Sequence, residues 1–220
     1  FLFIGSAQDH KRVGENDTGA NTGGMGAYSP AMIINKSLEK KIIKKIVRPT
    51  LKALNSKNHP YTGFLYVGLM IKNNEPYLIE YNVRMGDPEC QVIMPRLKTN
   101  LVKLLKASVE NRLDKVKIKW RKDKCMTIVV CAKGYPGKQL TSKKINLKKL
   151  SLNKKSFVFH AGTKIKDNFL YSNGGRVLSI VVLGNTFYKI RNQIFKIIKM
   201  INWKFGFFRR DIGWRVIKRK

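Results

Sequence analysis

The first strong periodicity along the chain is that of an amphipathic helix over residues 35–47. Its apolar side chains recur at spacings of three and four and fall on one stripe: Leu38, Ile42, Ile43, Ile46 and Val47. Asn35 or Ser37 can cap its start, and Pro49, which has no N–H to donate, limits or kinks it. Residues 1–35 are rich in Gly, Asn, Asp and Thr, which is typical of a strand followed by a long loop and a turn.

Short apolar runs predict a pair of strands after this helix. Gly63–Ile71 is a β-rich run bounded by turn residues, so we expect a buried strand there. The turn residues Asn73-Asn74-Glu75-Pro76 follow, and Tyr77–Tyr81 is expected to pair back as a second strand. A further stripe that includes Leu101, Leu104 and Leu105 predicts a helix beginning near Thr99.

The second half of the chain has the pattern of a small α+β domain. Residues 110–125 are highly charged and poor in large apolar groups, so we expect a linker there. Strands are predicted at Met126–Ala132, Ser156–His160 and Arg176–Leu183, followed by a helix from about Thr186 to Ile201. The predicted domains are residues 1–112 and 126–220, joined by a linker at 113–125.

Composition places the chain among packed proteins. Its 220 residues allow one medium or two small domains, and 43% hydrophobic residues exclude wholesale disorder. The run at Gly63–Ile71 is too short to cross a bilayer as a helix, which needs about 20 residues, so no membrane partner is expected. Phe1-Leu2-Phe3-Ile4 has neither an initiator Met nor the features of a signal peptide, so we expect a piece of a longer protein.

The charge of the chain admits two interpretations. Lys+Arg 45 against Asp+Glu 13 gives +32, which suggests a polyanionic partner. The cations are spread along the whole chain, however, and no sequence pattern of a nucleic-acid-binding motif is present, so a solvated surface shaped by compositional drift is the alternative and no specific nucleic acid is expected. Cys90, Cys125 and Cys131 form no C-x-x-C pair, which favours a reducing, cytoplasmic setting over disulfides or zinc.

Two polar segments in the first 30 residues carry candidate chemistry. Ser6-Ala-Gln-Asp-His-Lys-Arg12 offers an amide, a carboxylate, an imidazole and two cations, a set able to hold a zwitterion or to neutralise phosphate oxygens. Asn21-Thr-Gly-Gly-Met-Gly26 has glycines that let backbone N–H groups approach an anion, but it is neither a Walker A loop nor a dinucleotide-binding fingerprint. Each segment alone is also compatible with an ordinary surface loop.

The third candidate segment is Leu78-Ile-Glu-Tyr-Asn-Val-Arg-Met-Gly-Asp-Pro-Glu89. Residues two apart in a strand face the same side, so Glu80 and Asn82 present two oxygen ligands together, with Arg84 beside them if the strand continues. Mg²⁺ takes one or two protein oxygens and completes its shell with phosphates and water, and an Arg there would stabilise charge on a transferring phosphoryl group. The alternative is an amphipathic edge strand with a salt bridge.

Long blocks of the sequence resemble one enzyme family, the phosphoribosylamine–glycine ligases (glycinamide ribonucleotide synthetases) of the ATP-grasp superfamily. The blocks that carry the resemblance are Gln8-Asp-His-Lys-Arg12, Asn21-Thr-Gly-Gly-Met-Gly-Ala-Tyr-Ser-Pro30, Thr62-Gly-Phe-Leu-Tyr-Val-Gly-Leu-Met70, Glu80-Tyr-Asn-Val-Arg-Met-Gly-Asp-Pro-Glu89, Gly134-Tyr-Pro-Gly137, Phe159-His-Ala-Gly-Thr163, Asn173-Gly-Gly-Arg-Val-Leu178 and Arg210-Asp-Ile-Gly-Trp-Arg215. They follow in order over essentially the whole chain.

The resemblance implies a fold, a reaction and roles for individual residues. The expected fold is α+β: the late part of an ATP-grasp domain followed by the family's small carboxyl-terminal domain. The implied reaction joins glycine to 5-phosphoribosylamine with ATP through a glycyl phosphate, in a cytoplasmic enzyme that is monomeric when full length. The implied metal ligands for Mg²⁺ or Mn²⁺ are Glu80 and Asn82, and the implied catalytic residues are Arg84, Lys11 and Arg12. The implied substrate-binding residues are Asp9, His10, Asn21, Thr22, Gly23, Gly24, Met25, Gly26, Gly86, Asp87, Pro88 and Glu89.

The resemblance is to the carboxyl-terminal half of the family only. The family's amino-terminal domain and the small lobe that clamps ATP have no counterpart among these residues, so we expect the isolated chain to be inactive. Two functions stay open. One is a ligase half that acts within a longer chain or with a complementary fragment. The other is a non-catalytic basic module, derived from such a ligase, that binds polyanions.

Overall fold

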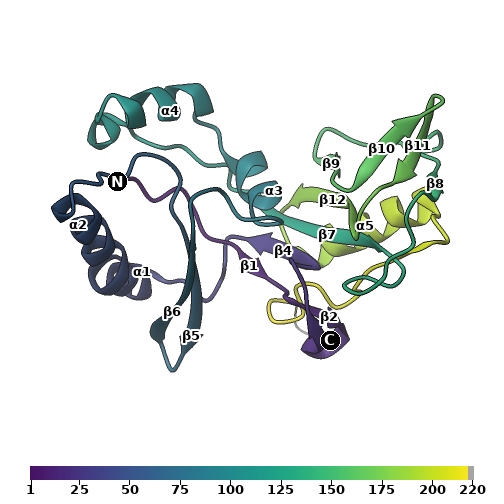
Figure 1. The fold of residues 1–220 in the computed structure, drawn as a ribbon, viewed down its shortest axis with the longest axis horizontal. Coiled ribbons are helices and arrows are strands. Elements are labelled where there is room, and N and C mark those ends of the chain that lie inside the picture. Colours follow the sequence, from purple (N-terminus) through teal and green to yellow (C-terminus); the bar gives the residue numbers. More distant parts are fainter. Residues whose placement is uncertain (218–220) are drawn as a thin grey trace. The chain divides into compact units, whose positions relative to one another are not determined.

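The chain forms two compact units that interleave along the sequence in the computed structural model, which describes residues 1–217 (Figure 1). Unit 1 comprises Phe1–Ile4, Ala31–Gly86 and Leu97–Trp120. Unit 2 comprises Gly5–Pro30, Asp87–Arg96 and the chain from Arg121 onward. Helices and antiparallel strands occur together, in agreement with the predicted α+β class.

Unit 2 is built on a six-stranded antiparallel sheet. Its strands are ordered β1-β4-β7-β12-β9, and β13 pairs with the end of β7. The bounds are β1 Gln8–Asp9, β4 Gly26–Ser29, β7 Lys124–Ala132, β9 Ser156–His160, β12 Arg176–Gly184 and β13 Gly206–Phe207. The long central pair runs from Arg176 opposite Cys131 to Gly184 opposite Lys124. The three strands predicted in this half of the chain are confirmed.

Both faces of this sheet are covered. The central strands are nearly continuous apolar runs, and such runs occur where a strand is buried on both sides. On one face packs α5 (Phe187–Ile201), whose buried residues recur every three or four positions: Phe187, Ile190, Ile194, Ile197 and Ile201. On the other face lies the short helix α3 (Cys90–Ile93), where Val92 packs with Ala27, Cys125 and Val181.

The predicted helix at the end of the chain is confirmed. Thr186 caps it by accepting a hydrogen bond from the backbone N–H of Lys189 at 3.3 Å, and Asn202 ends it in the left-handed conformation. Smaller elements complete unit 2. They are the hairpin β2 (Arg12–Gly14) and β3 (Thr18–Asn21) with the 3-10 turn η1 (Glu15–Asp17) between them, the three-stranded sheet of β8 (Lys144–Ile145), β10 (Thr163–Lys166) and β11 (Phe169–Ser172), and the turn η3 (Met94–Arg96).

Unit 1 contains a helical stretch that runs further than the sequence predicts. α1 (Lys36–Ile42) is capped by Asn35, one of the two predicted caps, whose side chain accepts from the Leu38 N–H at 2.9 Å. The helix does not stop at Pro49. A π-helical turn η2 (Ile43–Val47) leads directly into α2 (Arg48–Ser56), and the proline stands in the first turn of α2. The π turn is wider than an α-helical turn, so it leaves room for Pro49, whose nitrogen has no hydrogen to donate to the preceding turn.

The rest of unit 1 is a hairpin and one further helix. β5 (Tyr66–Lys72) pairs antiparallel with β6 (Glu75–Asn82) through the turn Asn73-Asn74, where both residues have positive φ. The strand predicted at Gly63–Ile71 is confirmed from Tyr66 onward, but the prediction that it is buried is wrong, because only Gly68 within β5 is buried. α4 (Leu101–Val109) begins two residues after the predicted start and is capped by Asn100, and η4 (Leu113–Lys115) lies in the predicted linker.

The hydrophobic core lies in unit 2. Both clusters of buried apolar side chains in the described part of the chain draw all their members from that unit. Within residues 1–217, no helix is both long and apolar enough to cross a membrane.

Candidate functional site

The predicted metal ligands lie on β6 in unit 1. The strand register sets Glu80 opposite Gly68 and Asn82 opposite Tyr66, so both side chains share one face of the hairpin, as their spacing predicts. Gly68 gives Glu80 its space, because a Cβ there would lie 2.9 Å from the Glu80 Cγ. The opposite face meets the helices: the hydroxyl of Tyr81 bonds that of Thr50 on α2. The Glu80 carboxylate is solvent-exposed.

Arg84 does not continue this face. β6 ends at Asn82, so the condition under which Arg84 would share the face of Glu80 and Asn82, a strand that continues to it, is not met. Its guanidinium donates instead to the carbonyl of Met85 at 2.8 Å. Gly86, which follows, is buried and is the last residue of this stretch of unit 1.

Unit 2 contains a carboxylate that burial makes hard to ionise. Asp9, on β1, has a side chain that is only 8% exposed, and it accepts from the His10 N–H at 2.6 Å. Lys11 Nζ lies 2.9 Å from its other oxygen. Burial, together with the negative charge of the buried Glu89, raises the pKa of Asp9 to about 6 despite the nearby Lys11 ammonium.

The glycine-rich segment folds tightly against this carboxylate. The Thr22 N–H and hydroxyl both donate to the carbonyl of Lys11, at 2.7 and 2.9 Å, and the Thr22 hydroxyl accepts from the Gly24 N–H at 2.9 Å. Gly24 has a φ of 116°, and a Cβ on it would lie 2.5 Å from Pro88 and 2.8 Å from Asp9. Only glycine therefore allows the three segments to meet here.

The remaining residues of the predicted glycine-rich segment make contacts that belong to the core and the strands of unit 2. Met25 is fully buried in the core of unit 2, where the Cys131 Sγ lies 3.7 Å from its sulfur. Gly26 is buried in β4, and Asn21 at the end of β3 is exposed and pairs with Arg12. The Arg12 guanidinium donates to the carbonyl of Gly19 at 2.9 Å, so in this structure it braces the β2–β3 hairpin.

Two residues from the second half of the sequence hold the glycine-rich turn. Arg176 Nη1 donates to the carbonyls of Gly23 and Asp87, at 2.7 and 2.8 Å, and its Nη2 donates to the Asp87 carboxylate at 2.8 Å. The Tyr135 hydroxyl accepts from the Gly23 N–H at 2.9 Å. Gly175 must lack a side chain, because a Cβ there would lie 2.1 Å from the Tyr135 ring.

Sequence reasoning assigned no role to Arg176 or Tyr135. Both stand in blocks that carry the family resemblance, Asn173-Gly-Gly-Arg-Val-Leu178 and Gly134-Tyr-Pro-Gly137. In each block, a charged or hydroxyl side chain stands next to glycine residues. That combination is the signal that could have found both residues.

A buried charge network braces the same region from the carboxyl-terminal side. Arg209 is 1% exposed and pairs with Asp17 at 2.9 Å and with Asp211 at 2.7 Å, and it donates to the carbonyl of Arg12 at 3.0 Å. Burial raises the pKa of Asp17, but hydrogen bonds and charge from Arg209 and Arg215 hold the pKa below its usual value. The network is close to neutral, which offsets the cost of burying each charge.

His10 is a structural histidine in this arrangement. Its Nδ1 lies 3.2 Å from the carbonyl of Gly26, and its Nε2 accepts the N–H of Gly213 at 3.1 Å. Burial, reinforced by the positive charges of Arg209 and Arg215, lowers its pKa to about 4. The neutral ring with the proton on Nδ1 therefore fits both partners.

The predicted residues thus fall into two groups. Within unit 2 the structure brings together Asp9, Lys11, Gly23, Gly24, Asp87, Pro88 and Glu89. Glu80, Asn82 and Arg84 belong to unit 1. In the described part of the chain, no group of three or more His, Cys, Asp or Glu residues is arranged to hold a metal ion, so a metal at Glu80 and Asn82 would need further ligands from phosphates or water.

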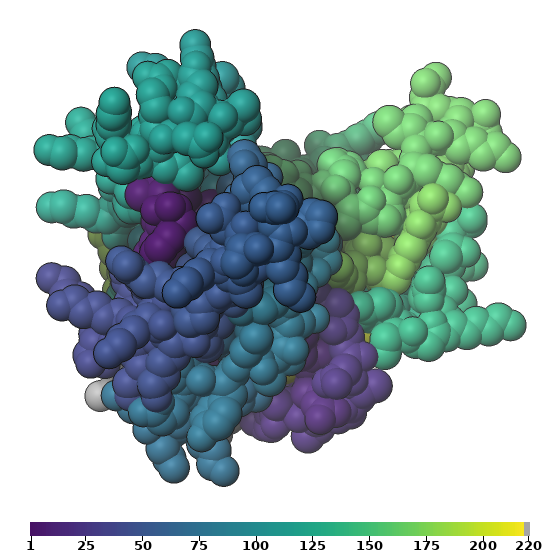
Figure 2. Space-filling view, turned by 60° about the vertical axis from the view of Figure 1, so that its left-hand side comes forward, coloured from purple at the N-terminus to yellow at the C-terminus, as the bar shows by residue number. Residues whose placement is uncertain are grey.

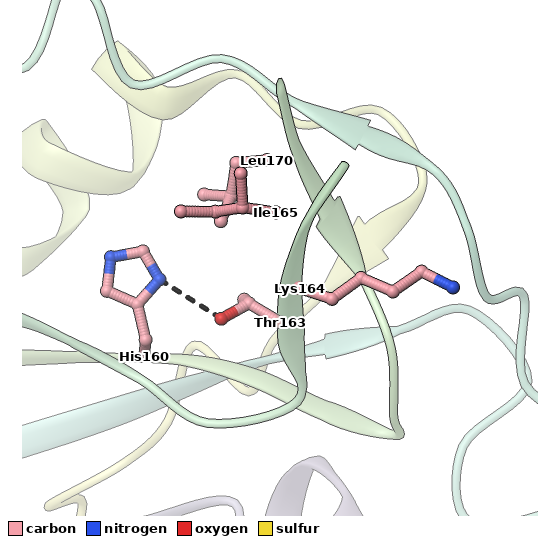
Figure 3. Close-up of a pocket in the computed structure, with 5 residues that line it drawn as sticks. All are labelled: His160, Thr163, Lys164, Ile165 and Leu170. Atoms are coloured by element: carbon pink, nitrogen blue, oxygen red, sulfur yellow. Dashed lines mark hydrogen bonds between the residues drawn. The ribbon is translucent and has the colours of Figure 1, made fainter. Parts of the chain in front are cut away.

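A cavity of about 390 Å³ in unit 2 lies apart from all these residues in the sequence (Figure 3). It is lined by His160 at the end of β9 and by Thr163, Lys164, Ile165 and Leu170 from β10 and β11. His160 Nδ1 lies 3.1 Å from the Thr163 hydroxyl, and the Lys164 ammonium points away from the other lining side chains. None of these residues is among the predicted site residues.

Comparison with known proteins decides the family. Residues 1–90 match the family model described as phosphoribosylglycinamide synthetase, ATP-grasp (A) domain, and residues 125–215 match the model described as phosphoribosylglycinamide synthetase, C domain. The chain belongs to the phosphoribosylglycinamide synthetase family. Among its relatives, the phosphoribosylamine–glycine ligase of Brucella melitensis is 43% identical over 220 residues, which cover 100% of this chain and 52% of the relative. The chloroplastic phosphoribosylamine–glycine ligase of Arabidopsis thaliana is 44% identical over 98% of this chain and 41% of the relative.

Solved structures give the same family and place the fold. The crystal structure of phosphoribosylamine–glycine ligase from Thermotoga maritima superposes with a TM-score of 0.79 and 33% identity, over 93% of this chain and 50% of that one. A biotin carboxylase domain of a thermophilic 2-oxoglutarate carboxylase matches with a TM-score of 0.59 at 12% identity, over 90% of this chain and 42% of that one, which concerns the fold alone. This member of the phosphoribosylglycinamide synthetase family has an ATP-grasp fold, and it spans about half the length of the curated relatives it matches.

Proposed function

We propose that this chain supplies the metal-binding strand and part of the substrate site of an ATP-dependent ligase that joins glycine to 5-phosphoribosylamine. The observation that carries the proposal is the pair Glu80 and Asn82, two oxygen ligands on one face of β6 with Gly68 leaving room beside them. A strand that served structure alone would not need this pair on its exposed face. Family membership supports the same reaction, because the relatives are phosphoribosylamine–glycine ligases.

In the proposed reaction a carboxylate oxygen of glycine attacks the γ-phosphorus of ATP. A new O–P bond forms, the bond from that phosphorus to the β–γ bridging oxygen breaks, and ADP leaves. The amine of 5-phosphoribosylamine then attacks the carbonyl carbon of glycyl phosphate. Phosphate leaves with the C–O bonding electrons, and the amine loses a proton to give the amide. Two anions must approach each other in the first step, so positive groups are needed beside them.

The donor set at β6 fits Mg²⁺ or Mn²⁺. One carboxylate and one amide oxygen are hard ligands, and these ions are commonly held by one or two protein groups together with nucleotide phosphates. A bound ion of this kind would neutralise charge on the transferring phosphoryl group. An ATP-grasp neighbour, the biotin carboxylase domain of Hydrogenobacter thermophilus 2-oxoglutarate carboxylase, is described in complex with MgADP.

We assign the other predicted residues as follows. Arg84, Lys11 and Arg12 offset negative charge on the reacting groups. Lys11 is held at Asp9 by their ion pair, which sets the position of its ammonium. The remaining substrate-binding residues, Asn21–Gly26 and Gly86–Glu89 with Asp9 and His10, shape the pocket for glycine and 5-phosphoribosylamine, and the contacts of Gly24 with Asp9 and Pro88 support a common surface.

The proposal extends to the setting of the complete enzyme. We propose that the complete enzyme is located in the cytoplasm, because Cys90, Cys125 and Cys131 are all free thiols. We also propose that the full-length enzyme is a monomer. We keep residues 1–112 and 126–220 as the two proposed domains with a linker at 113–125; the family matches end at 90 and resume at 125.

Activity of an assembled enzyme tests the proposal. We would join the part of the Brucella melitensis ligase that this chain does not match to the 220 residues and measure phosphate release. Release that needs ATP, Mg²⁺, glycine and 5-phosphoribosylamine together is expected, whereas the isolated chain should release none, because alignment of three reactants supplies much of the rate. Release by the assembled protein without glycine, or release by the isolated chain with both substrates, would contradict the proposal.

A second candidate function rests on the net charge of +32. A non-catalytic module derived from a ligase would use that charge to bind polyanions and would not need Glu80 and Asn82. Such a module would bind duplex nucleic acid or heparin while the assembled enzyme stays inactive, so the same assembled protein distinguishes the two functions.

A further inference from the structure

The three-stranded sheet of unit 2 has two unlike faces. Its antiparallel register sets Lys164 of β10 opposite Tyr171 of β11, and Tyr171 opposite Lys144 of β8, so these side chains form one row across the sheet. Lys166 opposite Phe169 forms the next row, two residues along each strand and therefore on the same face. We call this the lysine face, and its residues are Lys144, Lys164, Lys166, Phe169 and Tyr171.

The lysine face is turned to solvent, because the other face of the same sheet is turned to the core. On that other face Ile145 is 3% exposed within the core of unit 2, and Leu170 packs against the same core. The cavity in Figure 3 is also lined from that face, and the Lys164 ammonium points away from it. In Figure 2 the hairpin of β10 and β11 is the light green part at the right of the view. All three lysines of the lysine face are exposed, so a ligand in solution can reach them.

Aromatic rings lie among the cations on this face. The Phe169 side chain is 43% exposed, and the Lys144 Nζ lies 3.0 Å from the centroid of its ring. A phenyl ring attracts an ammonium through its quadrupole, which holds the cation beside the ring. Tyr171 stands half-buried between Lys144 and Lys164 in the first row. Positive charge and aromatic surface are therefore neighbours at the same exposed place.

The sequence around this sheet is almost free of acidic residues. Of the 13 Asp and Glu residues, only Asp167 lies between Lys124 and Arg210, whereas that segment holds 19 of the 45 Lys and Arg residues. The segment is 87 of the 220 residues, so the cations are spread evenly along the chain but the acids are not. Compositional drift towards lysine accounts for the even spread and leaves the missing carboxylates unexplained. The positive charge of this segment therefore has few carboxylates along the chain to offset it.

We propose that the lysine face binds single-stranded nucleic acid without preference for base sequence. Ammonium groups neutralise phosphates, and exposed rings beside them stack on unpaired bases, which is how proteins hold single strands irrespective of sequence. A duplex keeps its bases stacked inside, and heparin has no bases, so neither ligand uses the rings. None of the five residues belongs to the proposed ligase site, so this binding is independent of the proposed reaction.

The binding can be measured with the purified 220-residue chain and a fluorescein-labelled oligothymidylate. A length of about 12 nucleotides is within the usual site size of single-strand-binding folds. Fluorescence anisotropy over a range of salt concentrations gives the affinity and its salt dependence. Unlabelled duplex of the same length and heparin serve as competitors. At physiological salt the single strand should bind at least about fivefold more tightly than the duplex, because only the single strand offers bases to the rings.

Phe169→Leu tests the contribution of stacking. The change keeps an apolar side chain and the charge of the face but removes the ring. Oligothymidylate binding should weaken at least about fivefold, while its salt dependence and the binding of heparin stay unchanged. Phe3→Leu is the matched control, because Phe3 is also 43% exposed and lies in unit 1, and it should bind like the wild type. Circular dichroism should show that both variants are folded.

Lys164→Gln combined with Lys166→Gln tests the contribution of charge. Loss of two phosphate contacts should weaken oligothymidylate binding about tenfold and reduce the slope of log affinity against log salt concentration by about 1.4. Lys40→Gln combined with Lys44→Gln is the matched control, because it removes the same charge from two exposed lysines of the helical stretch in unit 1. The control should leave the affinity and the slope nearly unchanged. All four lysines are exposed, so neither change should disturb the fold.

Three results would overturn the proposal. The first is equal weakening by the two lysine pairs, which would show that the net charge of +32 attracts the strand diffusely. The second is unchanged binding by folded Phe169→Leu, or displacement of the probe by heparin and duplex as readily as by unlabelled oligothymidylate, which would identify a general polyanion site. The third is the absence of oligothymidylate binding by the wild-type chain at physiological salt.

Discussion

The guanidinium of Arg176, the first residue of β12, holds Asp87 through both the backbone carbonyl and the carboxylate, each at 2.8 Å. The same guanidinium holds the carbonyl of Gly23. Gly23 and Asp87 lie within the region matched to the ATP-grasp domain, whereas Arg176 lies within the region matched to the C domain. One side chain of the second region thus fixes the separation of two predicted substrate segments of the first.

Arg176→Lys is expected to loosen both segments together. A lysine has a single nitrogen and cannot reproduce three hydrogen bonds in a planar arrangement, so we expect a loss of about 1–2 kcal/mol in the free energy of unfolding. Hydrogen exchange should quicken in peptides that contain Gly23 and Asp87 and stay unchanged in β6. Arg48→Lys, an exposed arginine on α2, is the control and should change neither quantity. Exchange that quickens at Gly23 alone would mean that Arg176 does not couple the two segments.

Glu80→Gln in the assembled enzyme should weaken both Mg²⁺ binding and kcat. The change keeps the shape of the side chain but removes its negative charge, which weakens the hold on the metal ion. The ion is needed most while charge develops on the transferring phosphoryl group, so kcat should fall as well. A loss of about 2–4 kcal/mol in transition-state stabilisation is the expected scale, and Asn82→Ala should be similar or milder. Titration of activity with Mg²⁺ measures both effects.

Glu75→Gln is the matched control for this change. It lies on the same strand but pairs with Lys41 and Lys45 of the helical stretch, which hold its pKa below the usual value. It should leave the Mg²⁺ dependence unaltered. Near-normal kcat in Glu80→Gln, with Asn82→Ala merely unfolded, would show that β6 is structural and that the metal assignment is wrong.

The pH dependence of stability should reveal Asp9 and His10 as opposing groups. The Asp9 pKa rises from 3.8 to about 6 on folding, so the native state binds the extra proton between these values and loses stability as pH rises through them. The His10 pKa falls from 6.5 to about 4, so the unfolded state binds the proton and stability is lost as pH falls through that window. The two contributions have opposite signs and largely cancel between pH 4 and 6.

Asp9→Asn should remove one side of this balance. Its free energy of unfolding should rise more steeply with pH between 4 and 6 than that of the wild type, by up to about 1.4 kcal/mol per pH unit. The variant should also be the more stable protein at pH 7, because no buried charge then faces Glu89. Chemical denaturation at several pH values measures this. Parallel curves for the two proteins would show that Asp9 does not titrate in this range.

Polyanion binding by the chain should depend steeply on salt and weakly on sequence. Its cations are mostly lysines spread along the chain, so release of counterions would dominate the binding free energy. Filter binding with several duplexes over a range of salt concentrations tests this. A strong preference for one duplex at physiological salt would favour the basic module over a solvated surface.

Local spacing was enough to predict much of the fold and one part of the site. The β-rich runs at β7 and β12 and the apolar stripe of α5 identify the core. A strand buried on both faces reads as a continuous apolar run, and a helix buried on one face reads as an apolar stripe, so both patterns are visible within a few residues. The shared face of Glu80 and Asn82 follows from the period of a strand in the same way. The Asn35 cap was visible for the same local reason.

Tertiary structure decided what depends on distant partners. The exposure of β5 was not predictable, because an apolar run reports what a strand could bury and not whether anything covers it. The passage of the helix through Pro49 depends on a local π turn that propensity does not foretell. The clamp of Arg176 on Gly23 and Asp87 joins residues far apart in the chain, and the burial of Arg209 depends on Asp17 and Asp211 meeting around it. Periodicity is a property of neighbouring residues, whereas charge pairing and packing are set by segments that meet only after folding.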